Sequence, residues 1–127
     1  MLLVVASVLA FACDNPAGPS PVLGDEFTLA PGEQAQVEGT RLGVKFISVA
    51  GDSRCPMNAL CITGGDAQVK IEALSSSGKT PYDLHTGDMQ PVKHGEFIIA
   101  LVQLQPYPFA GKTTEPGDYR ATLRVTK

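Results

Sequence analysis

The sequence predicts an all-β protein: an immunoglobulin-like sandwich of two antiparallel sheets with about seven short strands. Polar and apolar residues alternate with period two in several segments, and no segment sustains the helical period. The chain contains 13 Gly and 10 Pro, which favours many turns between short strands. A small β-barrel is the alternative architecture.

Two strands have the clearest pattern. In segment 67–73, Ala, Val, Ile and Ala alternate with Gln, Lys and Glu, and segment 119–125 alternates in the same way from Tyr119. Each should cover a core with one face only. Segment 96–104, EFIIALVQL, is apolar on both faces, so we expect a central strand that is buried on both sides.

Four weaker segments complete the set of strands. They are 26–30, 33–38, 42–49 and 80–86. Turn-forming residues should separate the strands at Pro31–Gly32, Gly51–Asp52, Ser75–Gly78, Gly87–Asp88 and Pro116–Gly117. The closing segment PGDYRATLRV resembles a tyrosine corner, in which a tyrosine opens a late strand of a sandwich, but Tyr119 could equally be an ordinary core residue.

The N-terminus predicts export. Residues 2–12 form an uncharged apolar run that would rise only ~16 Å as a helix, too short for a ~30 Å hydrocarbon layer. Residues 1–12 are therefore expected to be a signal peptide. Ala10, Ala12 and Cys13 resemble a bacterial lipobox, which implies that Cys13 is lipidated, for example with palmitate. Ordinary secretory cleavage nearby and a structural segment are the alternatives.

The remaining chain divides into a tether and one domain. Residues 13–24 contain the lipidation site and a Pro- and Gly-rich spacer, and residues 25–127 have the length of a single β-sandwich domain. The expected location is the bacterial envelope, with the lipid as a membrane anchor on either the inner or the outer membrane. The net charge of −3, with scattered Lys and Arg, argues against nucleic acid as a partner.

The three cysteines divide into one lipidated residue and one pair, so we expect a disulfide between Cys55 and Cys61. The segment DSRCPMNALCITGGDAQV resembles a motif of small, uncharacterised exported bacterial lipoproteins, and LQPYPFAG and DYRATLRV resemble their closing segments. Such proteins often carry tryptophan where this chain has Thr63. The resemblance implies no established activity and no functional residues.

The disulfide loop is the first candidate site. A closed, proline-stiffened loop loses little entropy on binding. It would contact a partner, with Met57 or Leu60 as anchor, through Arg54, Pro56, Met57, Asn58 and Leu60. The alternative is that the disulfide only fastens an irregular connection whose apolar residues fold back into the core.

The second candidate is a copper or zinc site. Imidazole, thioether and carboxylate donors occur close together in the sequence, although their spacing matches no known metal motif, and the segment also reads as a polar turn. The donors are His85 and His94, with Asp83, Asp88 and Met89. No cofactor is otherwise expected, and no catalytic motif nominates an enzyme. The leading prediction is a non-enzymatic envelope lipoprotein that acts as a binding or structural module, with a periplasmic metal-binding protein as the alternative.

Overall fold

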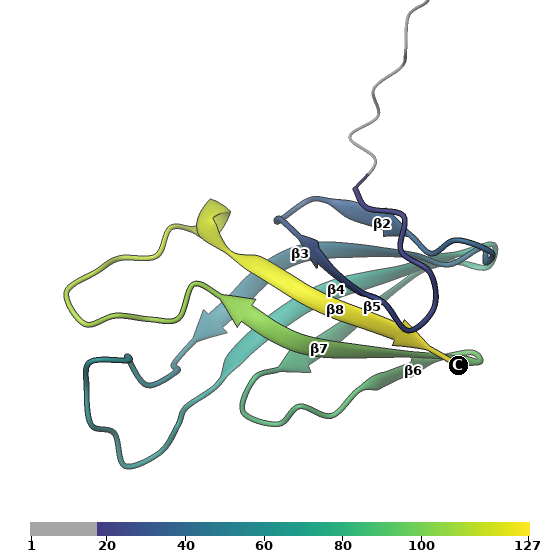
Figure 1. The fold of residues 1–127 in the computed structure, drawn as a ribbon. Coiled ribbons are helices and arrows are strands. Elements are labelled where there is room, and N and C mark those ends of the chain that lie inside the picture. The colour runs from purple at the N-terminus through teal and green to yellow at the C-terminus, as the bar shows by residue number, and fades with distance from the viewer. Residues whose placement is uncertain (1–17) are drawn as a thin grey trace, which may run out of the picture.

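The computed structural model describes residues 18–127, so the expected signal peptide, Cys13 and the first part of the expected tether lie outside the described residues. The chain folds into two open, four-stranded antiparallel sheets (Figure 1). One sheet has the order β2 (Gln34–Gln36), β3 (Gly43–Asp52), β4 (Ala67–Ser75) and β5 (Gly78–His85). The other has the order β1 (Glu26–Leu29), β8 (Arg120–Thr126), β7 (Phe97–Gln105) and β6 (Val92–His94). The predicted β-sandwich is confirmed, with eight strands.

The core lies between the sheets. Strand β4 buries every second residue from Ala67 to Ala73 and leaves the residues between them partly exposed, as the alternation predicts. The largest fully buried side chains come from both sheets and the β2–β3 connection. They are Phe46, Leu29, Leu42, Ile71, Leu84, Ile99, Leu104, Leu123, Val37, Val44, Val69 and Val125.

Strand β7 corrects one expectation. It is central in its sheet, between β8 and β6, but it is buried on one face only. Ile99, Leu101 and Leu104 are buried against the opposite sheet, whereas Ile98 and Ala100 are partly exposed. The prediction of burial on both faces was wrong because a sandwich has two layers, and no third layer covers the outer face of β7.

Two further expectations differ from the structure. The expected break at Gly51–Asp52 does not occur, because two bulges let β3 continue, with Gly51 opposite Gln68 and Asp52 opposite Ala67. The segment read as a polar turn contains β6, a three-residue edge strand paired with β7. A strand of three residues is too short for its alternation of polar and apolar side chains to be recognised in the sequence.

Part of the expected tether belongs to the folded domain. The carbonyl oxygen of Pro21 accepts a hydrogen bond from the amide of Glu38 (2.8 Å), and the amide of Gly24 donates to the carbonyl of Val125 (2.8 Å). Gly18 packs against the backbone carbonyl of Gln34 so closely that a side chain would clash. The chain therefore enters the domain beside β2.

Three long connections emerge at one end of the sandwich, which we call the loop end: residues 53–66, 86–91 and 106–119 (left in Figure 1). The tight β4–β5 and β6–β7 turns and the C-terminus lie at the opposite end. Among residues 18–127 there is no helix long and apolar enough to cross a membrane.

Candidate functional site

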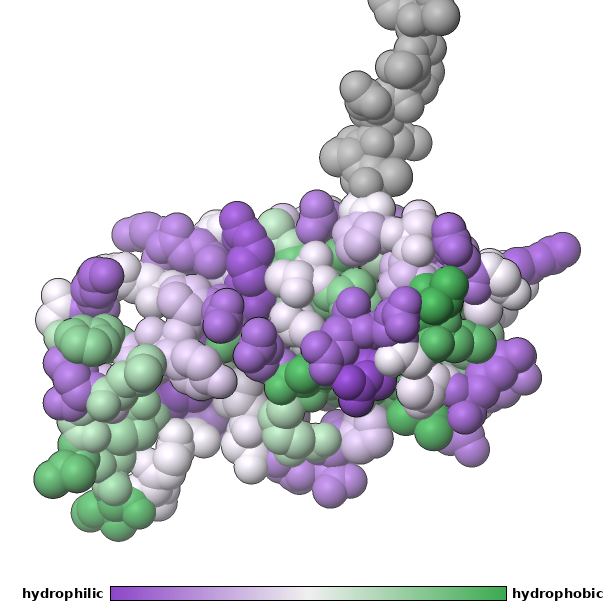
Figure 2. All heavy atoms as spheres, in the orientation of Figure 1, coloured by the Kyte–Doolittle hydropathy of each residue, from purple (hydrophilic) through white to green (hydrophobic). Residues whose placement is uncertain are grey.

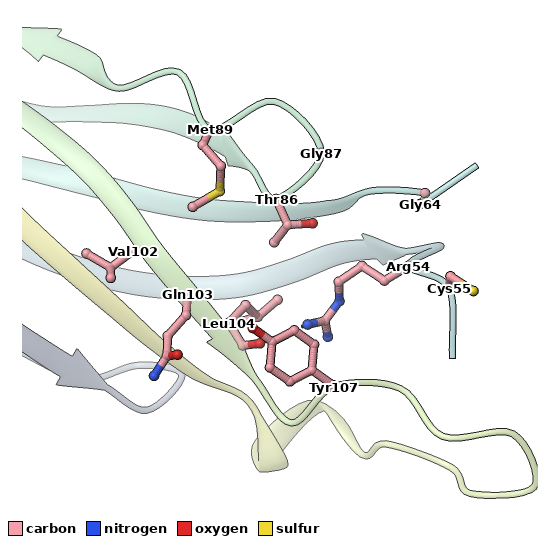
Figure 3. Close-up of a pocket in the computed structure, with 11 residues that line it drawn as sticks. Arg54, Cys55, Gly64, Thr86, Gly87, Met89, Val102, Gln103, Leu104 and Tyr107 are labelled. Atoms are coloured by element: carbon pink, nitrogen blue, oxygen red, sulfur yellow. The ribbon is translucent and has the colours of Figure 1, made fainter. Parts of the chain in front are cut away.

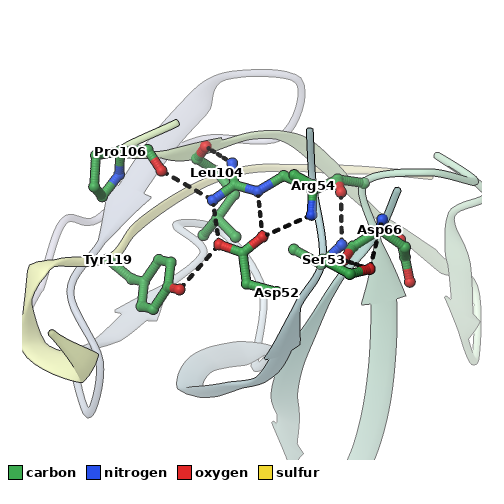
Figure 4. A network of polar contacts seen from close by, with 9 residues as sticks. Asp52, Ser53, Arg54, Asp66, Leu104, Pro106 and Tyr119 are labelled. Carbon is green, nitrogen blue, oxygen red and sulfur yellow. Dashed lines mark hydrogen bonds and ion pairs between the residues drawn. The ribbon is translucent and has the colours of Figure 1, made fainter. Parts of the chain in front are cut away.

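A buried polar network supports the loop end (Figure 4). Arg54 donates from Nε and Nη2 to the two carboxylate oxygens of Asp52, at 2.8 and 2.7 Å. It also donates to the backbone carbonyls of Leu104 (2.8 Å) and Pro106 (2.9 Å). Tyr119 donates from its hydroxyl to Asp52 at 3.0 Å. The network thus connects the end of β3 with the end of β7 and the start of β8.

This geometry revises the role expected for Arg54. Its residue exposure is only 9%, and four of the five guanidinium donors have an acceptor, so the side chain is not displayed to a partner. A bidentate carboxylate pair is the arrangement that makes a buried guanidinium tolerable, because it neutralises the charge and fills the donors. Arg54 is a structural residue that fixes the loops around it.

The network also changes the interpretation of Tyr119. A tyrosine corner would direct its hydroxyl to the backbone a few residues upstream. Here the hydroxyl reaches the Asp52 carboxylate, and the ring is buried in the core. Burial raises the pKa of Asp52, but hydrogen bonds from Arg54 and Tyr119 and the Arg54 charge outweigh it, so the net pKa is lowered. Burial and the Asp52 carboxylate raise the pKa of Tyr119.

The disulfide loop is held against the β7–β8 connection. Cys55 and Cys61 form the expected disulfide. The amide of Met57 donates to the carbonyl of Pro108 (2.9 Å). Asn58 accepts from the amide of Ala110 (2.7 Å) and donates to its carbonyl (3.4 Å). Asn58 therefore uses its amide group to join the two loops, which we did not expect from the sequence.

Asp66 fastens the base of the same loop to the β5–β6 connection. One carboxylate oxygen accepts from the amide of Gly87 (2.8 Å), and the other lies 2.7 Å from Nδ1 of His85. The backbone carbonyl of Asp66 accepts from the amide of Ser53 (2.7 Å). Burial raises the pKa of Asp66, but the hydrogen bonds from Gly87 and His85 and the His85 charge reverse the effect, so the net pKa is lowered.

The apolar side chains of the disulfide loop point to solvent. Met57 is 70% exposed, and Leu60 and Ile62 are fully exposed, so the alternative in which they fold into the core was wrong. Residues 55–65 contain no charged side chain. Figure 2 shows the resulting apolar patch at the lower left, over the loop end. Ile62 belongs to this surface but was missed because it follows the second cysteine.

Other exposed apolar side chains gather at the same end. Tyr107 is 50% exposed, Phe109 47% and Met89 45%, and the only large exposed apolar residues elsewhere among those described are Val22 and Leu23. The segment LQPYPFAG could have indicated this surface. It places two aromatic residues in an uncharged, proline-rich connection, and such connections usually run over the protein surface.

A pocket of about 570 Å³ opens beside Tyr107 (Figure 3). Its lining includes Met89 and Leu104, the backbone of Gly64, and Arg54, whose Cζ lies 5.5 Å from the centroid of the Tyr107 ring. Because Asp52 neutralises the guanidinium, the pocket has no net positive charge to attract an anion. Its volume is within the range of small-ligand sites, so it has ample room for an apolar side chain of a partner.

The two histidines have different partners. His85 contacts Asp66, whereas Nδ1 of His94 lies 2.9 Å from the hydroxyl of Tyr82. The other three expected donors are also dispersed: Asp83 pairs with Lys70 at 3.2 Å, Met89 lines the pocket, and Asp88 is exposed. Within residues 18–127, no three His, Cys, Asp or Glu side chains converge as metal ligands. The metal alternative gains no support from the geometry.

No family model matches the chain, and neither the curated proteins nor the solved structures contain a match to it.

Proposed function

We propose that this protein is a non-enzymatic, exported envelope lipoprotein whose sandwich domain binds a partner protein through the disulfide loop. The observation that carries the proposal is the full exposure of Leu60 and Ile62 on an uncharged loop. A protein that only needed to fasten this connection would gain stability by burying them, by about 1.5–3 kcal/mol for each side chain. Their display is explained if a partner buries them.

The loop is also prepared for binding. The disulfide closes it, and Met57 and Asn58 tie its backbone to the β7–β8 connection. A loop that is already ordered loses little conformational entropy when it binds. Cys55 and Gly64, at the two ends of the loop, line the pocket at Tyr107, so a partner that contacts the loop also meets a hollow at its base. Such paired features are typical of the energetic centre of an interface.

The proposal is tested by photocrosslinking in the living bacterium with the full chain. A photoreactive amino acid replaces Leu60 or Ile62, and a matched control replaces Lys79, which is exposed at the opposite end. We expect a discrete crosslinked protein from positions 60 and 62 and none from position 79, and Met57→Ser in the same chain should reduce its yield. Crosslinks to lipid alone, or none from either loop position, would refute the proposal.

A further inference from the structure

A second surface at the loop end is not explained by the disulfide loop. Two hollows of about 440 and 420 Å³ share Pro106, Tyr107 and Asp118, so they adjoin one another in one grooved surface along the β7–β8 connection. Each is within the size range of small-ligand sites. We call it the aromatic groove. Its members include Pro106, Tyr107, Phe109, Lys112, Thr113, Thr114 and Asp118.

Two aromatic rings of the groove are exposed but held in place. Tyr107 and Phe109 are about half exposed. Arg54 packs over the Tyr107 ring, with Cζ 5.5 Å from the ring centroid. The turn that follows Phe109 is fixed because the side chain of Asn58 accepts a hydrogen bond from the amide of Ala110. The amide of Lys112 donates to the carbonyl of Phe109 (2.9 Å), which closes that turn. The backbone that carries both rings is therefore ordered before a ligand binds, and we call the two exposed rings the platform.

Hydrogen-bonding groups lie beside the platform without partners of their own. In the described part of the chain, the side chains of Lys112, Thr113 and Thr114 make no hydrogen bond or ion pair, although all three line the groove. One carboxylate oxygen of Asp118 accepts from the amide of Glu115 (2.9 Å), and the other accepts no hydrogen bond. The groove thus offers an ammonium group, two hydroxyls and a carboxylate oxygen.

This combination excludes several classes of ligand. The groove carries charges of both signs, from Lys112, Arg120 and Asp118, so charge alone does not define its ligand. A purely apolar ligand would bury Lys112 and Asp118 without hydrogen-bond partners, which is unfavourable. A peptide would not add to the groove as a strand, because the groove is lined mainly by the β7–β8 connection and not by a strand edge.

We propose that the aromatic groove binds an oligosaccharide. A pyranose ring has an apolar C–H face, which can stack on Tyr107 and Phe109, and a rim of hydroxyls that both donate and accept hydrogen bonds. Lys112 would donate to these hydroxyls, Asp118 would accept, and Thr113 can do either. The two joined hollows would accommodate successive sugar units. This site goes beyond the proposed protein contact: it shares Met57 and Tyr107 with that surface, whereas Phe109, Lys112 and Thr113 belong to the groove alone.

Calorimetric titration of the full-length protein tests the site, in a detergent without a sugar headgroup. The probes are soluble tetrasaccharides of β-1,4-linked N-acetylglucosamine, β-1,4-linked glucose and β-1,4-linked mannose. We expect saturable binding of at least one probe at millimolar concentrations. Phe109→Ala should weaken it about tenfold, the upper range for loss of one aromatic contact. Phe109 is an exposed residue, so this variant should fold normally.

Leu60→Ser is the matched control, because it removes an exposed apolar side chain from the neighbouring loop. It should abolish the protein crosslink from position 62 and leave sugar binding unchanged. Phe109→Ala and Thr113→Ala should weaken sugar binding and leave that crosslink unchanged. The two proposals can therefore fail separately. Absence of saturable binding to all three probes, or binding that Phe109→Ala does not weaken, would overturn the oligosaccharide site.

Discussion

The hydroxyl of Tyr119 donates a 3.0 Å hydrogen bond to the carboxylate of Asp52, which lies 67 residues earlier in the chain. Asp52 ends β3 in one sheet, and Tyr119 precedes β8 in the other, so the bond joins the two layers at the loop end. The same carboxylate holds Arg54, whose other donors fix the end of β7. The scaffold that presents the exposed side chains therefore depends on one acidic residue.

Asp52→Asn should lower the free energy of unfolding by about 3 kcal/mol. The substitution removes the charge that neutralises Arg54, and an uncompensated buried charge costs about 3–5 kcal/mol. Tyr119→Phe removes only one neutral donor and should cost about 1 kcal/mol. Urea unfolding followed by circular dichroism, without reductant, measures both.

The matched control is Asp83→Asn. Asp83 pairs with Lys70 at 3.2 Å, but both side chains are nearly half exposed. Such a surface pair contributes less than ~1 kcal/mol. An equal loss of stability in the Asp52 and Asp83 variants would contradict the buried network.

Stability should decline in acid. The folded-state pKa of Asp52 and of Asp66 is lowered relative to the ordinary value of 3.8. Between the folded and unfolded pKa values, the unfolded chain therefore binds more protons than the folded one. The stabilisation by each carboxylate is fully present above the unfolded pKa and is lost as the pH falls through the lower, folded pKa. The free energy of unfolding should be flat down to about pH 5 and then fall. Asp52→Asn should show a shallower acid decline than the parent, and an identical slope would be inconsistent with this origin.

The disulfide should stabilise the loop more than the domain. Closure of a loop of about seven residues corresponds to roughly 2 kcal/mol in the chain-entropy estimate, so Cys55→Ser with Cys61→Ser should cost about that amount. The buried core does not depend on either cysteine, so the variant should remain folded. Mass spectrometry of the protein purified without reductant should find the two cysteines joined. Free thiols in that sample would contradict the pairing.

The sequence was sufficient for the strands whose residues alternate and for the disulfide. Strand β4 alternates from Ala67 to Ala73, and the structure buries the residues that the pattern assigns to the core. It was insufficient where a strand is short, as in β6, or where apolar residues occupy a face that no layer covers, as in β7. The local sequence pattern indicates which residues are able to be buried, but the number of layers in the fold determines how many of those residues are buried.

The candidate site was predicted in part for a similar reason. Met57 and Leu60 were expected to be displayed and are exposed. Arg54 and Asn58 were assigned to the contact surface, but each is engaged with the β7–β8 connection, about 50 residues later in the chain. A polar residue in or beside the disulfide loop has the same local sequence whether its side chain faces solvent or donates a hydrogen bond to a distant carbonyl. Only the tertiary arrangement distinguishes the two.

Cys13→Ala should abolish metabolic labelling of the protein with palmitate. Lipidation is predicted at this cysteine, and the four residues between it and Gly18 would keep the domain close to the bilayer. The variant should also move from the membrane to the soluble fraction. A Pro19→Ala variant, changed within the spacer, should keep its label. Labelling that persists in Cys13→Ala would rule out the lipidation site.

Gly65→Ala should destabilise the protein by more than about 1 kcal/mol, whereas Gly64→Ala should be nearly neutral. Gly65 has φ +68°, and a Cβ there would collide with the backbone carbonyl of Ser53, which lies at the base of the disulfide loop. Ser53, which directly follows β3, cannot move away easily, because its amide donates a hydrogen bond to the carbonyl of Asp66. Gly64 has no atom within 4 Å of the same position. Conformational strain at positive φ adds to the steric cost at Gly65 alone. Thermal unfolding of the two variants measures the difference, and equal midpoints would show that the close contact between Gly65 and Ser53 does not limit the fold.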